Sequence, residues 1–367
     1  MAHSPRLFVT FSTALIALPI AVKADITFFG NARAYAMGGA GLAIVDRSER
    51  TSPVNPAALA LYNRRVRVFF PGIGLHASGI GLKQAWDHLV ERPDSNDATT
   101  LAKDFGGHDS SFGVNLSWGA KFGHLDATAT GTAIVRVFPN EALKTWANNA
   151  NGDTTQLTGQ EKADLLGAAI YSLPVIGVAE RISPGGSPIR VEAGARIKLS
   201  RAVYSHYIVS SSNIANNTPA SPAPELNGGT TLTQDGVGLD AGLLVHPRGH
   251  NGFSGAAVVT NLVDPGFVFN GTDVNGNPAR YDLQPRSVSV GSAYENGKAI
   301  LAYDIVDLSR AYGDIQHRFG IEYRTRKIAL RGGYASTRGF TVGFGWGYLE
   351  FAYGARAPLE IAQTLRF

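Results

Sequence analysis

Apolar and polar side chains alternate along the C-terminal part of the chain, and this alternation constrains the fold more than any other feature. Between Gln316 and Phe367, five consecutive runs place aromatic or aliphatic residues at every second position, with charged residues or glycine between them. Successive side chains of a β-strand point to opposite faces, so each run predicts a strand with one apolar and one polar face. Such strands occur in soluble β-sandwiches, but alternating segments of about ten residues separated by turns are typical of transmembrane β-barrels.

The same alternation recurs upstream and raises the total to about fourteen predicted strands, which lies within the range of such barrels. The further candidates are 65–78, 112–118, 125–137, 166–179, 189–200, 237–245, 252–262, 287–294 and 299–308. Long polar connections occur at 79–110, 139–164, 202–234 and 264–286. The first of them has apolar residues at helical spacing, which predicts a short helix over 82–89.

The connections between these long loops are short, and this regular sorting of loop lengths favours one fold class. Outer-membrane barrels have short periplasmic turns and longer outer loops, whereas a soluble sandwich has no reason to sort its loops in this way. The sequence therefore predicts an all-β fold, a closed antiparallel transmembrane β-barrel of about fourteen strands with an N-terminal plug.

The N-terminus predicts a secretory signal peptide over residues 1–24. His3 and Arg6 precede a short apolar stretch, and Ala24 is a small residue suited to cleavage. The mature chain then divides into a plug segment, 25–63, and the barrel, 64–367. No run of about eighteen apolar residues occurs in the sequence, which excludes a helical membrane span.

Composition and motifs exclude several functional classes. The chain has no cysteine and therefore no disulfide. A net charge of +4, spread without a basic block, gives no support for a nucleic-acid partner. The sequence contains no nucleophile elbow and no histidine pair with metal-ligand spacing, so we expect no enzyme activity, no metal and no cofactor. His246 and His250 flank a predicted tight turn and are interpreted as solvated turn residues.

The polar faces of the predicted strands carry charges of both signs. An Arg or Lys on the lipid face costs about 2–4 kcal/mol at mid-depth, so these residues are expected to line the lumen. Interior salt bridges and an ion-selective lining both remain open. The predicted lumen-lining residues are Arg190, Glu192, Arg196, Lys198, Asp240, Asp304, Arg318, Glu322, Arg324, Arg331, Glu350 and Arg356.

The segment after the signal peptide is rich in glycine and alanine and lacks strand alternation. Its small residues would allow close packing inside a barrel, since glycine permits close backbone approach. A flexible periplasmic tail is the alternative. The residues predicted to form a plug are Asn31, Arg33, Met37, Gly38, Gly39, Gly41, Asn55 and Pro56.

Two groups of motifs resemble a known family. Ala32–Ala43 with Asn55-Pro56-Ala57 resembles the N-terminal segment of the FadL superfamily of outer-membrane proteins. His317–Tyr323 and Ala329–Tyr334 resemble its PorV-like secretion and TraF-like conjugal-transfer branches, of which the TraF-like branch is the most similar. The resemblance implies an outer-membrane barrel in a Gram-negative bacterium, with a plug and, in the transporters, a kinked strand for sideways release of an apolar ligand.

The resemblance leaves two functions open. The first is a FadL-like conduit for passive uptake of small hydrophobic compounds, with outer-membrane lipid and a small hydrophobic ligand as partners. The second is a non-transporting accessory protein of a conjugation or secretion system, with components of that system as partners. No aromatic-rich inward cluster can be placed from the sequence, which counts against fatty-acid passage.

Overall fold

The computed structural model of the chain describes residues 32–45, 54–62, 66–78, 98–149, 153–249, 251–325, 327–347, 349–354 and 360–365. The predicted signal peptide, the predicted helix at 82–89, Asn31 and Arg356 lie outside the described residues.

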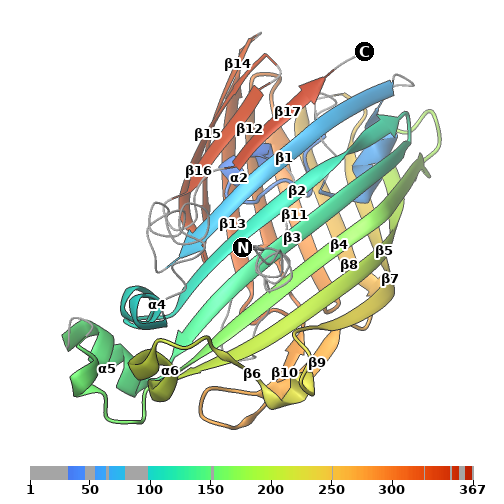
Figure 1. Cartoon of the computed structure of the whole chain (residues 1–367). Coiled ribbons are helices and arrows are strands. Elements are labelled where there is room, and N and C mark those ends of the chain that lie inside the picture. Colours follow the sequence, from blue (N-terminus) through green and yellow to red (C-terminus); the bar gives the residue numbers. More distant parts are fainter. Residues whose placement is uncertain are drawn as a thin grey trace, which may run out of the picture.

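Fourteen antiparallel strands make up the main sheet of the described chain, and a two-residue strand extends it (Figure 1). The fourteen are β1 Val66–Ser78, β2 Ser110–Phe122, β3 Leu125–Pro139, β4 Lys162–Arg181, β5 Ile189–Ser210, β7 Leu232–Pro247, β8 Gly252–Val263, β11 Ser287–Glu295, β12 Ala299–Val306, β13 Gln316–Arg324, β14 Ile328–Ala335, β15 Gly339–Trp346, β16 Leu349–Gly354 and β17 Glu360–Leu365. The short strand is β6, Ser221–Pro222, and a separate hairpin consists of β9 Val268–Thr272 and β10 Pro278–Asp282. The prediction of a large all-β antiparallel sheet is confirmed.

The order of hydrogen-bonded neighbours returns to its starting strand. It runs from β4 through β3, β2 and β1 to β17, then backward along the chain through β11, β8 and β7 to β5. Strand β4 also pairs with β5 over Lys162–Arg181. Each of the fourteen strands therefore has a neighbour on both sides, which satisfies the backbone groups that a sheet edge would leave unpaired.

The helices of the described chain are short. They are α2 Ala32–Ala36, η1 Pro56–Leu61, α4 Ala98–Phe105, α5 Glu141–Asn149, η3 Thr154–Gln156, α6 Ser211–Asn216 and η4 Pro224–Leu226. Within the described ranges, no helix has the length and apolarity needed to cross a membrane. Helices α4, α5 and α6 gather at one end of the sheet, where Leu143, Trp146 and Ile214 share a small buried core (Figure 1).

Two details of the predicted connections are wrong. The turn 336–338 is short, although it belongs to the same end of the sheet as the long connections. Strand β5 continues to Ser210, ten residues past the predicted end at 200. The apolar outer positions of β5 stop near Leu199, and Arg201 follows on that face, so the alternation fades while the strand continues.

The outer face of the sheet is apolar, as expected for the alternating strands. Exposed aromatic side chains include Phe253, Phe340 and Trp118, which are 77%, 71% and 57% exposed. The exposed pair of Arg201 and Asp235 lies on β5 and β7, where the apolar positions end. This pair therefore marks the limit of the exposed apolar band on that side.

Candidate functional site

The N-terminal segments lie against the inner face of the sheet. Helix α2 packs on β14 to β17, and η1 packs on β4, β5 and β7. Figure 1 shows these blue segments within the curve of the sheet, away from α4, α5 and α6. Almost every described residue of 32–45 and 54–62 is buried. Two stretches next to each other in sequence are therefore fixed to distant strands of the sheet.

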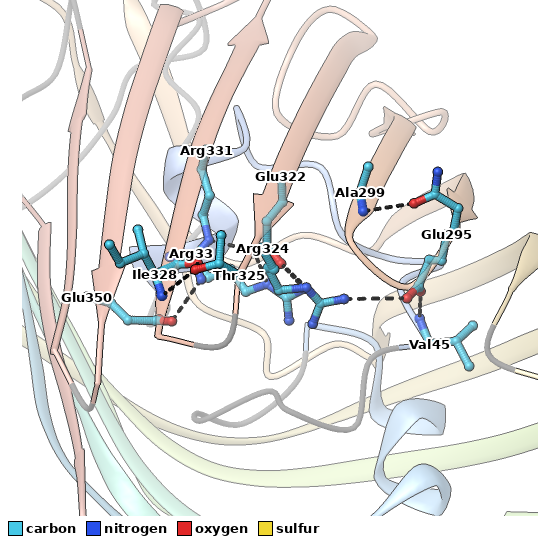
Figure 2. Close-up of polar contacts among 11 residues, drawn as sticks. Arg33, Val45, Glu295, Ala299, Glu322, Arg324, Thr325, Ile328, Arg331 and Glu350 are labelled. Carbon is cyan, nitrogen blue, oxygen red and sulfur yellow. Dashed lines mark hydrogen bonds and ion pairs between the residues drawn. The ribbon is translucent and has the colours of Figure 1, made fainter.

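A charged network fixes the first segment (Figure 2). Arg33 of α2 donates from Nε and Nη2 to the Glu322 carboxylate of β13, at 2.8 and 3.1 Å. The same carboxylate accepts from Arg331 Nε of β14 at 2.6 Å, and Arg324 Nε lies 2.9 Å away. Arg331 also donates to Glu350 of β16 at 2.9 Å. Because Glu322 is fully buried, it joins three guanidinium groups in a setting where charge pairs are strong.

Backbone donors of the segment also find partners on the sheet. Asp304 of β12 accepts from the amides of Gly41 and Leu42, at 2.7 and 3.1 Å. Glu295 of β11 accepts from the amide of Val45 at 2.5 Å. A segment without strand pairing leaves its amides unsatisfied, so these inward carboxylates supply acceptors that the segment needs.

Asn55 and Pro56 lie where the second segment meets β5 and β7. The Asn55 amide donates to the carbonyl oxygens of Leu42 and Leu243, at 3.1 and 3.0 Å, and so joins both segments to β7. A Cβ at Gly194 of β5 would lie about 2.5 Å from the Pro56 backbone. Glycine is therefore required there for close backbone approach.

The predicted plug residues are mostly brought together, but not all of them are crowded. Arg33, Met37, Gly38, Gly39, Asn55 and Pro56 are buried. Gly38 has a φ of +68°, and a Cβ there would lie 2.6 Å from Tyr334 backbone atoms. A Cβ at Gly41 would meet only the Ile44 side chain, at 3.7 Å. The close approach thus depends on Gly38 rather than on every glycine of the run.

The other predicted inward residues also occupy the inner face. Glu192, Asp240, Asp304, Arg318 and Glu350 are buried, and Arg190, Arg196, Lys198 and Arg324 are partly buried. Lys198 donates to Asp240 and Asn261, at 2.7 and 2.6 Å, and Arg196 pairs with Asp126 at 3.1 Å. The contacts with Asp240 and Asp126 are salt bridges within the wall.

His246 is not a solvated turn residue, contrary to the sequence interpretation. Its side chain is 2% exposed, and Nε2 lies 3.5 Å from Glu192 Oε1. Nδ1 is 2.8 Å from the carbonyl oxygen of Pro247, to which it donates. The strand β7 continues to Pro247, so position 246 still alternates inward instead of entering the turn. His250 lies outside the described residues.

An apolar cluster lines the inner face near the long connections, and the sequence interpretation missed it. Strands β3, β4 and β5 contribute one wall, and the hairpin β9–β10 with its flanks packs onto it. The buried members are Ile134, Phe138, Leu166, Ala168, Ile170, Ala202, Tyr204, Leu226, Phe267, Phe269, Tyr281 and Leu283. Tyr204 stacks on Phe269 with ring centroids 4.9 Å apart. The connection 264–286, expected to be a polar outer loop, thus returns aromatic side chains to the inside.

Arg136 of β3 is buried between Ile134 and Phe138 of this cluster. It is 3% exposed, and its Nε and Nη1 atoms have no hydrogen-bond partner. Burial lowers the pKa of its guanidinium to about 9. An unpaired buried cation is costly, so Arg136 differs from the paired arginines around Glu322. Within the described ranges, no three His, Asp or Glu side chains are grouped so as to hold a metal ion.

No protein-family model matches the chain, and no curated protein matches its sequence. Solved structures do match it. The Pseudomonas putida toluene transporter TodX has a TM-score of 0.39 and 14% identity, covering 93% of this chain and 97% of TodX. A Pseudomonas aeruginosa FadL homologue has a TM-score of 0.27 and 11% identity, covering 91% of this chain and 95% of the homologue.

The outer membrane phospholipase A from Escherichia coli has a TM-score of 0.25 and 8% identity, covering 82% of this chain and 92% of the phospholipase. At these identities the similarity concerns the fold alone. The absence of enzyme activity stays a prediction. The comparisons give no support to the TraF-like branch that the motifs favoured.

Proposed function

We propose that the chain forms a closed β-barrel in the outer membrane of a Gram-negative bacterium and conducts small hydrophobic compounds by passive diffusion. One observation carries the proposal: fourteen strands pair in an order that returns to its start, with apolar side chains outside and a buried N-terminal segment inside. Lipid offers no hydrogen bonds to backbone groups, so a spanning sheet must close on itself. The signal peptide at 1–24 is the route to that membrane.

Residues 25–63 act as the plug of the barrel, 64–367. The charged network around Glu322 and the acceptors on Asp304 and Glu295 support this role, because they join the segment to strands β11 to β16. The inward charges line the lumen as paired groups. Paired charges of both signs favour a filled, weakly conducting interior over an ion-selective channel.

The apolar cluster near the long connections is the first contact for a ligand. Aromatic and aliphatic side chains with few polar groups are typical of sites for apolar ligands. A compound would enter between the hairpin β9–β10 and the wall of β4 and β5, and then pass the plug segment. This inward cluster favours the conduit over the accessory role.

The accessory role has its own supporting observation. Helices α4, α5 and α6 form a small unit with a shared buried core at the end of the sheet, and such a projection offers a docking surface. A conjugation or secretion component would bind there. Loss of this unit would leave a conduit intact but would abolish an accessory function.

Uptake of a neutral hydrophobic dye by intact Gram-negative cells tests the conduit. We expect faster uptake in cells that produce the chain than in cells that do not. Ala202 is fully buried in the apolar cluster, so Ala202→Trp is expected to fill the route and to return uptake to background. Ala257→Trp, at an exposed position on β8, is the matched control and should leave uptake unchanged.

Folding of each variant is checked by the heat-dependent migration of the barrel on gels. Equal uptake by Ala202→Trp and the unchanged chain, with both folded, would contradict passage along this wall. Uptake no faster than in cells without the chain would reject the conduit and leave the accessory role.

A further inference from the structure

A histidine between two carboxylates joins an outer connection to the wall of the sheet. His206 of β5 is fully buried. Its Nδ1 lies 2.5 Å from Glu225 Oε1 of η4, and its Nε2 lies 3.2 Å from Asp164 Oδ1 of β4. Position 206 is five residues past Arg201, where the apolar outer band ends. The group therefore lies at the end of the sheet beyond the lipid-facing band.

The three side chains hold a segment that covers the inner wall. Leu226, next to Glu225, is buried in the apolar cluster. The amide of Ala223 donates to the carbonyl oxygen of His206 at 3.0 Å. Gly271 of β9 lies against the Glu225 carboxylate, with no room there for a Cβ. If Glu225 left His206, the segment 221–226 would lose its side-chain attachment to β5 and keep only the backbone bonds of β6 and Ala223.

The geometry makes this attachment depend on a proton. An ionised carboxylate only accepts hydrogen bonds, and a neutral imidazole has a single N–H. With both carboxylates ionised, one of the two nitrogen–oxygen contacts is therefore an acceptor–acceptor contact unless the imidazole is protonated. An imidazolium donates from both nitrogens and balances two carboxylates that would otherwise repel each other in an apolar setting.

The charged groups that contact His206 are Asp164 of β4 and Glu225 of η4. Tyr204 of β5, Tyr281 of β10 and Asp273 in the turn of the hairpin lie around these carboxylates, and Arg136 of β3 is in register with His206 two strands away. The acidic groups outnumber the bases in this set. Burial opposes the charged imidazole, but the two carboxylates outweigh it and raise the pKa of His206 above its ordinary 6.5.

We propose that His206, Asp164 and Glu225 form a proton-dependent latch, which keeps the segment 221–226 on the inner wall and releases it as the pH rises. A raised folded pKa means that the stabilisation is complete below pH 6.5 and is lost as the pH passes the raised value. Access from outside to the apolar cluster is then greater in alkaline than in acidic surroundings.

Cysteine labelling measures this release directly, because the chain has no cysteine of its own. Ala223 is 1% exposed, whereas Ser221, two residues away, is exposed. Ala223→Cys and Ser221→Cys are placed in separate folded proteins and labelled in intact cells with an impermeant thiol reagent. The rate at position 223 divided by the rate at 221 corrects for the general dependence of thiol reactivity on pH.

We expect this ratio to rise about tenfold or more between about pH 6 and pH 9, since each unit beyond the pKa changes the protonated fraction tenfold. His206→Gln should remove the rise. Glu225→Gln should move it to lower pH, because the imidazole keeps only one carboxylate. His124→Gln is the control, since His124 is an exposed histidine paired with Glu180 at a short turn, and it should leave the profile unchanged.

A flat ratio in the otherwise unchanged chain would overturn the latch, as would an equal rise in His206→Gln. If His206→Gln does not fold in the gel assay, the test of the latch rests on Glu225→Gln, in which the rise of the labelling ratio should move to lower pH. The readout involves no transport. A pH-dependent labelling ratio without dye uptake would support the latch and reject the conduit. Dye uptake with a labelling ratio that does not change with pH would support the conduit and reject the latch.

Discussion

The two sides of the sheet share the alternating strand pattern but differ in strand length and in the chemistry of their inner faces. Strands β11 to β16 have six to nine residues, whereas β4 and β5 have 20 and 22. The inner face of the short side is charged and holds the segment 32–45 through Glu322, Asp304 and Glu295. The inner face of the long side, beyond the outer apolar band, is apolar and holds the hairpin β9–β10.

The difference shows that the chemistry of the inward side chains matches the segment that packs against them. The N-terminal segment presents unpaired backbone amides and a buried arginine, so its wall supplies carboxylates. The hairpin already satisfies its backbone by pairing β9 with β10, so its wall supplies mainly apolar surface. The apolar outer face is common to both sides, whereas their inner faces differ.

Glu322→Gln tests the charged side with the largest expected effect. It removes the negative charge that Arg33, Arg324 and Arg331 share, and losing one partner of a buried ion pair costs about 3–5 kcal/mol. We expect a lower urea midpoint for loss of the heat-modifiable folded form. Glu180→Gln is the control, because Glu180 pairs with His124 at an exposed turn, and it should leave the midpoint unchanged. Equal midpoints for both variants would show that the network does not stabilise the fold.

The sequence predicted the strands well and their ends poorly, for a physical reason. The outer apolar band imposes alternation on every strand while it crosses the band, so the fourteen strands are visible in the sequence. Beyond Leu199 the outward positions of β5 mix Arg201 with Val203, and the inward positions include the apolar Ala202, so the strand continues without a regular alternation. The burial of His246 and the length of β5 follow from strand extension that alternation does not encode.

The apolar cluster was missed because its members come from separate parts of the chain. Phe267 and Phe269 alternate before the turn at 273–277, and Tyr281 and Leu283 alternate after it. Two short alternating runs around an Asp- and Gly-containing turn predict a hairpin, which was the available signal. Its docking on Leu166 and Tyr204 depends on contacts between distant residues, which a single sequence does not show.

Gly38→Ala tests whether the N-terminal segment is closely packed against the sheet. Its added Cβ would lie 2.6 Å from Tyr334 backbone atoms, and its φ is +68°. Overpacking costs about 1–3 kcal/mol, so we expect faster proteolysis of the segment with the strands still folded. Gly41→Ala is the matched control, since a Cβ there meets only Ile44 at 3.7 Å. The close-packing account fails if the two variants are cut at the same rate.

Arg136→Met tests the apolar side, where the expected effect on stability is opposite in sign. The variant replaces an unpaired buried guanidinium with an apolar side chain of similar length. Even paired buried charges are often replaced by apolar groups with a gain of about 1–4 kcal/mol, so we expect a modest rise in the urea midpoint. Arg248→Met, at an exposed position in a short turn, should leave the midpoint unchanged.

The pH dependence of this gain identifies its cause. In the folded chain burial lowers the pKa of Arg136 from its ordinary value to about 9. Below that value the guanidinium is charged in both the folded and the unfolded state, and the folded state bears the full cost of burying it. As the pH rises past about 9 the folded state loses the proton first, so the stability of the unchanged chain increases. The difference in urea midpoint between Arg136→Met and the unchanged chain should therefore become smaller in alkaline buffer. A difference that stays constant with pH would indicate that better packing, and not the removed charge, stabilises the variant.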